Sequence, residues 1–197
     1  SDEEGPSISY RLAGRTSLPS RADQQMVRIL GTELPSRSYH LATPVLSSYV
    51  YREAEITNAS EHDLLGGSLA AYLDGRFVGR GEIPTVTRGE TFVVGFGVDP
   101  QLRTRRELVS KNEGVQGGNR EITLRYALQV ENFGEAATVR VLDRLPYTNR
   151  SGDVRITLGE TSDPLSQDPL YLRRERPKGI LRWDVEVAAE PIGEKAR

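Results

Sequence analysis

The sequence contains no cysteine and only two histidines, His40 and His62. The lack of cysteine excludes disulfide bonds, thiolate nucleophiles and cysteine-ligated zinc. His40 lies in a strand-like pattern and His62 in a polar, turn-like one, and we expect both on the surface. The Gly-x-Ser-x-Gly motif of the nucleophile elbow is also missing. These absences remove most of the side-chain combinations on which enzymes rely.

Long hydrophobic runs and an excess of one charge are missing as well. No run of about 18 apolar residues is found, so no helix is expected to span a bilayer. The net charge of −2 argues against nucleic acid or an anionic membrane as a partner. Residues 1–6 are polar and acidic, and we expect them to be flexible; they do not resemble a signal peptide.

Lysine is scarce. Three of the 26 basic residues are lysines (Lys111, Lys178 and Lys195), so the other 23 are arginines. Genomic codon bias explains such a ratio without any structural role. The alternative is that guanidinium groups pair with carboxylates between strands, because arginine bonds bidentately where lysine does not.

Alternation of apolar and polar residues is the main positive signal. In residues 121–131 every even position from Ile122 to Val130 is apolar or aromatic, which indicates a long strand with one solvated face. Asn132-Phe133-Gly134-Glu135 follows as a turn, and residues 136–142 alternate again. We therefore predict a β-hairpin formed by residues 121–131 and 136–142.

Similar patterns occur along the rest of the chain. Asp74-Gly75 between residues 67–73 and 77–80 is typical of a two-residue hairpin turn. Further strands are predicted at 7–12, 25–34, 38–42, 48–57, 91–97, 106–111, 154–158 and 181–187. Residues 159–179 form the one long predicted loop. About eleven short strands with little or no helix predict an all-β, antiparallel β-sandwich; a closed barrel is the alternative.

The chain is expected to be a single domain over residues 1–197. The regular strand at 181–187 should have a hairpin partner, and residues 188–197 are too short and polar to supply it. We therefore expect the final strand to be missing after residue 197, and residues 181–187 to lie at an open sheet edge.

Carboxylates are the remaining candidates for chemistry. Glu53 and Glu55 share one strand face, and Asp163 and Asp168 lie in the long loop. Neither pair fits a catalytic or calcium-binding pattern that we can defend. The sequence therefore predicts no catalytic residues, no metal ligands and no cofactor, and we expect the protein not to be an enzyme.

Two motifs are expected to be structural. Asp143-Arg144-Leu145-Pro146 follows a strand, and Pro146 should end it because proline donates no ladder hydrogen bond. Asp143 is expected to accept backbone N–H bonds and Arg144 to pair with a strand carboxylate. Trp183 shares a face with Leu181, Val185 and Val187, which predicts a core position.

Several segments together resemble the carboxy-terminal domain of mucoidy inhibitor A family proteins. The matching stretches are Ala54-Glu55-Ile56-Thr57-Asn58-Ala59-Ser60, Leu64-Leu65-Gly66-Gly67, Tyr72-Leu73-Asp74-Gly75-Arg76-Phe77-Val78-Gly79, Asp143-Arg144-Leu145-Pro146 and Gly179-Ile180-Leu181-Arg182-Trp183. The resemblance covers about residues 7–187. It implies a domain of unknown function within a larger bacterial protein that is exported to the periplasm or cell envelope, and it carries over no catalytic residue.

The leading functional hypothesis is a non-catalytic structural or protein-interaction domain of such an envelope protein. Its partner would be another protein or another domain of the same polypeptide. One alternative is a carbohydrate-binding module that uses Tyr39, Tyr49 and Tyr51 as exposed rings. A second alternative is a hydrolase that uses carboxylates.

Overall fold

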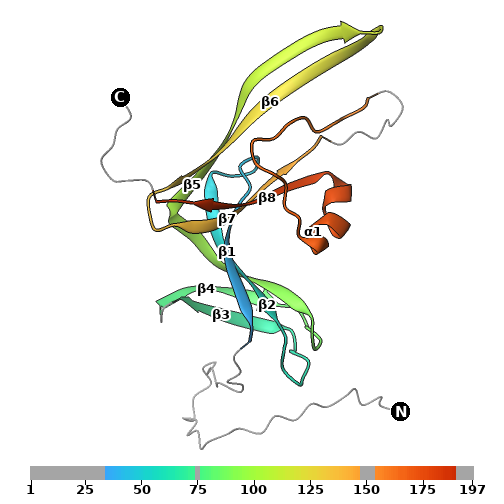
Figure 1. Cartoon of the computed structure of the whole chain (residues 1–197). Coiled ribbons are helices and arrows are strands. Elements are labelled where there is room, and N and C mark those ends of the chain that lie inside the picture. Colours follow the sequence, from blue (N-terminus) through green and yellow to red (C-terminus); the bar gives the residue numbers. More distant parts are fainter. Residues whose placement is uncertain (1–33, 74–75, 147–153, 190–197) are drawn as a thin grey trace, which may run out of the picture.

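The computed structural model describes residues 34–73, 76–146 and 154–189. Within these ranges the chain forms eight strands, one short α-helix and one 3₁₀ turn (Figure 1). The elements are β1 (Ser36–Ala42), β2 (Tyr49–Thr57), β3 (Gly67–Leu73), β4 (Arg76–Ile83), β5 (Thr91–Gln116), β6 (Asn119–Asn132), β7 (Ala137–Arg144), α1 (Pro169–Arg174), η1 (Arg176–Lys178) and β8 (Ile180–Val187).

Six strands form one strongly curved sheet in the order β6-β5-β2-β1-β7-β8. All neighbours are antiparallel except β1 and β7, which run parallel. The sheet curls until its two end strands approach each other, where the Asn132 side-chain amide donates to the Val187 carbonyl at 3.2 Å. The result is a barrel that is nearly closed.

The hydrophobic core lies inside this barrel. Alternate residues of each strand point inward, as the period of two requires. Fully buried apolar side chains come from β1, β2, β5 and β7, namely Ala42, Val50, Leu102, Val139 and Val141. Half-buried side chains of β6, β7 and β8 pack against them, namely Leu128, Val130, Ala137, Trp183, Val185 and Val187.

Strand β5 is 26 residues long and pairs with two different strands. Its first part pairs with β2, and its second part pairs with β6 from Leu102 opposite Asn132 to Gln116 opposite Asn119. Beyond the barrel, β5 and β6 continue as a projecting two-stranded ribbon (Figure 1). We call residues 107–127 the arm. Gly117 and Gly118, at φ 58° and 83°, make its turn, a backbone conformation that glycine adopts without steric cost.

Strands β3 and β4 form a separate two-stranded sheet. They pair antiparallel from Gly67 opposite Ile83 to Leu73 opposite Arg76, which confirms the predicted hairpin. The predicted turn residues Asp74 and Gly75 lie outside the described residues. An isolated bridge between Leu64 and Val86 joins the base of this hairpin.

The all-β class is confirmed, but the eleven-stranded sandwich is wrong. The described residues hold eight strands, and one curled sheet encloses the core instead of two stacked sheets. Residues 91–97 and 106–111 are parts of the single strand β5. Residues 154–158 alternate in sequence but join no ladder. The predicted strands at 7–12 and at most of 25–34 lie outside the described residues.

The predicted hairpin between residues 121–131 and 136–142 is also wrong. Both strands exist, but β6 pairs with β5, and β7 pairs with β1 and β8. The reason is that β8 occupies the place beside β7 that β6 would have taken. The turn between β6 and β7 lies beside the end of β8. There the side-chain amide of buried Asn132 donates hydrogen bonds to the carbonyls of Glu135 and Val187.

The predicted loop at 159–179 contains α1 and η1. Asp168 caps α1 by accepting from the backbone N–H groups of Leu170 and Tyr171, with Pro169 at the first helical position. Neither helical segment in the described ranges is long and apolar enough to cross a membrane.

Candidate functional site

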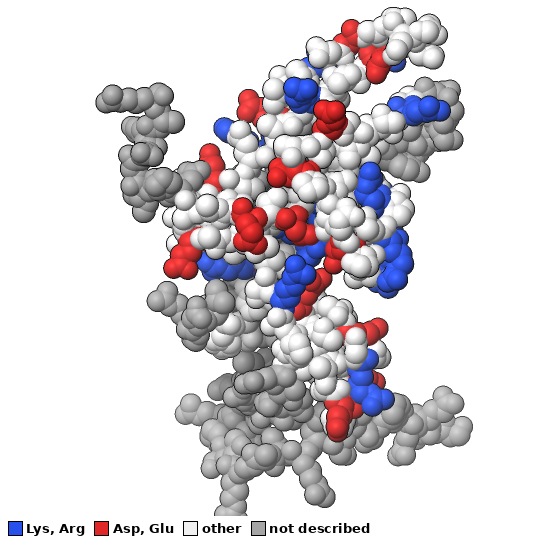
Figure 2. Space-filling view, viewed as in Figure 1, with Lys and Arg blue, Asp and Glu red and all other residues white. Residues whose placement is uncertain are grey.

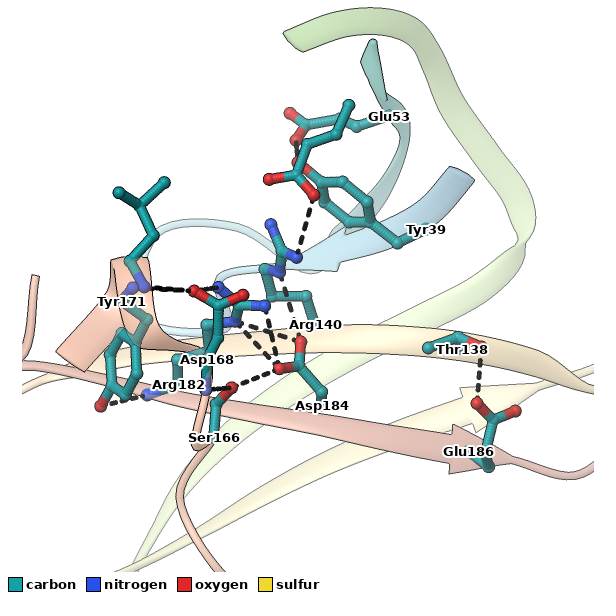
Figure 3. A network of polar contacts seen from close by, with 12 residues as sticks. Tyr39, Glu53, Thr138, Arg140, Ser166, Asp168, Tyr171, Arg182, Asp184 and Glu186 are labelled. Carbon is teal, nitrogen blue, oxygen red and sulfur yellow. Dashed lines mark hydrogen bonds and ion pairs between the residues drawn. The ribbon is translucent and has the colours of Figure 1, made fainter. Parts of the chain in front are cut away.

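A network of arginines and carboxylates covers the outer face of β7 and β8 (Figure 3). Asp184 lies at its centre and accepts from the Arg182 guanidinium at 3.0 Å, from Arg140 Nε at 3.3 Å and from the Ser166 hydroxyl at 2.6 Å. Burial alone would raise the pKa of Asp184, but Ser166 and the two arginines outweigh it and lower the pKa below its usual value. Asp184 therefore stays ionised and ties three segments together.

Arg140 extends this network towards β1 and β2. Its guanidinium lies 3.9 Å from the centre of the Tyr39 ring and 3.8 Å from a Glu55 carboxylate oxygen. The Tyr39 hydroxyl donates to Glu53 at 2.8 Å. Burial and the bond to Glu53 raise the pKa of Tyr39 well above its usual value, which keeps the hydroxyl protonated as a donor. Glu53 and Glu55 thus contact network residues.

The segment before β8 packs onto the network through Tyr171 and Ser166. The Tyr171 hydroxyl donates to the Ile180 carbonyl at 3.0 Å and accepts from the Arg182 backbone N–H at 3.2 Å. The Ser166 backbone N–H donates to the Arg182 carbonyl at 2.8 Å, on the side of β8 away from β7. This segment is thereby fixed against the edge strand.

A second polar cluster faces the barrel interior. Asp99 on β5 accepts from His40 Nε2 at 3.0 Å, from Arg52 at 2.8 Å and from the Gln101 backbone N–H at 2.9 Å. Burial would raise the pKa of Asp99, but these three donors outweigh it and lower the pKa. The predicted surface position of His40 is wrong, because His40 shares the inward parity of buried Ala42. His62 is exposed, as expected.

Asp143 joins the end of β7 to the base of the arm. One carboxylate oxygen accepts from the Arg144 backbone N–H at 2.8 Å, and the other accepts from Arg106 Nε at 3.1 Å. The Arg106 guanidinium also stacks 3.5 Å from the centre of the Tyr126 ring. Arg144 is the last residue of β7 and is exposed, and Pro146 follows two residues later.

The predicted aromatic residues fall in different environments. Trp183 is half-buried against the core cluster and donates its indole N–H to the Asp163 carbonyl. Tyr49 and Tyr51 are exposed on the outer face of β2. Tyr39 is only 7% exposed, so its expected role as an exposed ring is wrong. The structure therefore brings together two of the three proposed sugar-contacting tyrosines.

The arm exposes a row of apolar side chains. Ile122, Leu124 and Tyr126 continue the inward-facing series of Leu128 and Val130, but within the described residues no core lies beneath them. Leu108, directly opposite Tyr126, adds to the same face. Charges of both signs follow the arm (Figure 2), three acidic and three basic: Glu107, Glu113, Glu121, Lys111, Arg120 and Arg125. The sequence pattern located β6 but could not show that the apolar side chains in its arm part are exposed.

Neither polar cluster resembles a metal centre. Within the described residues no group of three or more histidine, aspartate or glutamate side chains is placed to hold a metal ion. The clusters pair arginine with carboxylate across strands, which is the structural role that the arginine-rich composition left open. Sequence reasoning missed these pairs because strand order determines which charges meet.

Comparison with known proteins places the chain in a family. A nematode protein, Protein F37C4.5 of Caenorhabditis elegans, is 25% identical over 190 residues, covering 91% of this chain and 34% of that protein. The chain thus spans about a third of the length of this relative. No solved structure matches the chain significantly. Residues 2–194 match the family described as a domain of unknown function, DUF4139, and the chain belongs to that family.

Proposed function

We propose that this domain is a non-catalytic protein-interaction module and that the arm is its contact surface. The observation that carries the proposal is the exposed apolar row of Ile122, Leu124 and Tyr126 on β6, with Leu108 opposite Tyr126 on β5. Contiguous exposed apolar surface on a folded domain is typical of a binding surface, because leaving it in water costs free energy. A paired ribbon also holds these side chains in fixed positions before binding.

The polar clusters support binding over catalysis. Asp184 and Asp99 are each held by several donors, and Glu53 and Tyr39 bond to each other. A general acid or base must be free to reach a substrate proton. These groups contribute to holding strands in register, and we propose that this is their role.

A setting within a longer polypeptide follows from the length of the relative. Because the chain corresponds to about a third of that nematode protein, we propose that it works as one domain of a larger protein. The mucoidy inhibitor A resemblance and the bacterial envelope location stay predictions.

Site-specific photo-cross-linking in the full-length protein tests the proposal. A photoreactive amino acid replaces Leu124 on the arm or, as a matched control, Leu170, an equally exposed leucine on α1. We expect cross-links to protein from position 124 and few from position 170. Equal yields from the two positions would exclude the arm as the contact surface.

The carbohydrate-binding alternative now rests on Tyr49 and Tyr51. Both rings are exposed, and Tyr51 lies opposite exposed Val98 on β5. A glycan array with the purified chain and its Tyr51→Ala variant separates the two functions. Binding that is lost in the variant would favour a glycan ligand, and an empty array would leave the arm as the proposed site.

A further inference from the structure

We infer that the arm binds a second copy of this chain by antiparallel pairing of β6 with β6, centred on Thr123. The inference rests on the proposed function and names a partner for the same arm, bound through the open edge of β6. Three observations carry it: an unpaired strand edge, one favoured register, and two charges that lack partners.

The outer edge of β6 is the first observation. Within the described residues β6 pairs only with β5, and the Asn132 side chain donates a hydrogen bond to β8 at the barrel end. Every residue from Asn119 to Tyr126 is exposed. A long edge strand with unpaired N–H and C=O groups is a template for another strand.

The alternation along β6 restricts the register. If the twofold axis lay between two successive residues of β6, apolar side chains of one copy would lie opposite polar side chains of the other. The axis must therefore lie where one residue is opposite the same residue of the second copy. An axis at Glu121 or at Arg125 would place like charges directly opposite each other, which is unfavourable.

Between Glu121 and Arg125, three centres remain: Ile122, Thr123 and Leu124. An axis at Ile122 places Glu121 opposite Thr123, and an axis at Leu124 places Arg125 opposite Thr123. Only an axis at Thr123 places Glu121 opposite Arg125, twice by symmetry, and Ile122 opposite Leu124, also twice. The segment Glu121-Ile122-Thr123-Leu124-Arg125 is therefore complementary to its own antiparallel copy.

Among the described residues, Glu121 and Arg125 have no ion-pair partner. On β5, Glu121 lies opposite Gly114 and Arg125 lies opposite Ser110. The other charges near the tip behave differently, since Glu113 pairs with Lys111 at 2.7 Å and with Arg120 at 2.6 Å. In the part of the chain that the structure describes, neither Glu121 nor Arg125 makes an ion pair within 4.0 Å. A second copy supplies the missing partner to each.

The paired arms would form one continuous four-stranded ribbon. A twofold axis perpendicular to the sheet keeps the same face up in both copies, so the two apolar stripes join side by side. The shared ladder runs from Asn119 opposite Ala127 to Ala127 opposite Asn119. This stretch lies on the arm, away from the barrel end where β6 approaches β8.

Charge reversal tests the register. Sedimentation of the purified 197-residue chain at increasing concentration should show a monomer–dimer equilibrium. Glu121→Arg and Arg125→Glu should each raise the dimer dissociation constant about tenfold or more, because each places two like-charged pairs at the interface. The double variant restores both pairs in swapped form and should dimerise as the original chain does. Circular dichroism checks that the variants stay folded.

Cysteine cross-linking provides an independent test, since the chain has no cysteine. Thr123→Cys should give an interchain disulfide readily. The control is Asn112→Cys, because Asn112 is exposed directly opposite Thr123 on β5, one strand further from the axis. It should give little disulfide-linked dimer.

Several results would overturn the inference. One is a chain that stays monomeric up to its solubility limit. Others are a dimer dissociation constant that neither single charge reversal changes, or a weakened dimer that the double variant does not restore. Equal disulfide yields from Thr123→Cys and Asn112→Cys would also overturn it. A monomeric chain whose arm still cross-links to another protein would refute self-pairing and leave the proposed function standing.

Discussion

Strands β5 and β6 build both the barrel wall and the arm, and the two regions differ in what covers their apolar side chains. Leu102 in the barrel part of β5 is 1% exposed, whereas Leu108, six residues further along the same strand, is 49% exposed. Both belong to one continuous ladder with β6. Pairing with β6 therefore keeps both parts of β5 extended, but an apolar side chain of β5 is buried only where other strands of the sheet pack over it.

The charges show the same contrast. In the barrel, Arg140 and Arg182 share Asp184 across neighbouring segments, and Arg182 is 5% exposed. On the arm, Glu121 and Arg125 face small residues instead of opposite charges. Within the described residues, these barrel charges pair with one another, whereas Glu121 and Arg125 on the arm make no ion pair.

Substitution of the two leucines should separate the regions most clearly. Leu102→Ala leaves a cavity in the core and should lower the free energy of unfolding by about 2–5 kcal/mol. Leu108→Ala removes an exposed side chain and should change it by about 0.5 kcal/mol or less. Denaturant unfolding of both variants at low concentration measures the difference. Similar losses would mean that the arm also forms part of the core.

Removal of a buried arginine should have the next largest effect. Arg182→Met deprives Asp184 of its closest guanidinium, and a lost hydrogen bond to a charged group costs about 1.5–3 kcal/mol. Arg125→Met on the arm should have little effect on the unfolding of the monomer. Thermal unfolding of the two variants checks this; if they melt alike, the outer-face network does not stabilise the barrel.

Acid should weaken the barrel through its two low-pKa aspartates. Because the pKa of Asp99 and of Asp184 lies below the ordinary value of 3.8 in the folded chain, the folded state binds fewer protons than the unfolded state. The stabilisation is present above about pH 4 and is lost as pH falls through the lowered pKa values. Asp184→Asn should make the acid dependence of unfolding shallower.

High salt should affect the ion pairs of the arm and those of the barrel differently. Hydrogen bonds from Lys111 and Arg120 also lower the pKa of Glu113, an exposed residue of the arm. At about 1 M salt, where charges are screened within about 3 Å, any effect of Glu113→Gln should vanish while that of Asp184→Asn persists. If salt abolished both effects equally, the barrel network would be no better shielded than the arm.

Alternation in the sequence predicted most of the strands but not their neighbours. The 121–131 pattern located β6, and Asp74-Gly75 predicted the β3–β4 pairing. The partner of β6 was predicted wrongly, because a short turn favours a hairpin and nothing local reveals that β8 takes that place. Strand order depends on contacts between distant segments.

For the candidate sites, too, the sequence indicated individual residues but not the distant residues that they contact. Asp143 was singled out from its motif, but its partner Arg106 lies 37 residues away on β5. The capped helix α1 had a local signal in Asp168-Pro169 that could have been recognised. The uncovered face of the arm had none, because Leu124 on the arm and Leu128 in the barrel belong to one unbroken alternation.

Amide hydrogen exchange of the intact chain tests the central claim most directly. In dilute solution we expect strong protection of β1, β2 and β7, and weak protection of those β6 amides between Asn119 and Ala127 that point away from β5. As concentration rises, these arm amides should gain protection while the barrel amides stay unchanged. Arm protection that does not depend on concentration would contradict the account.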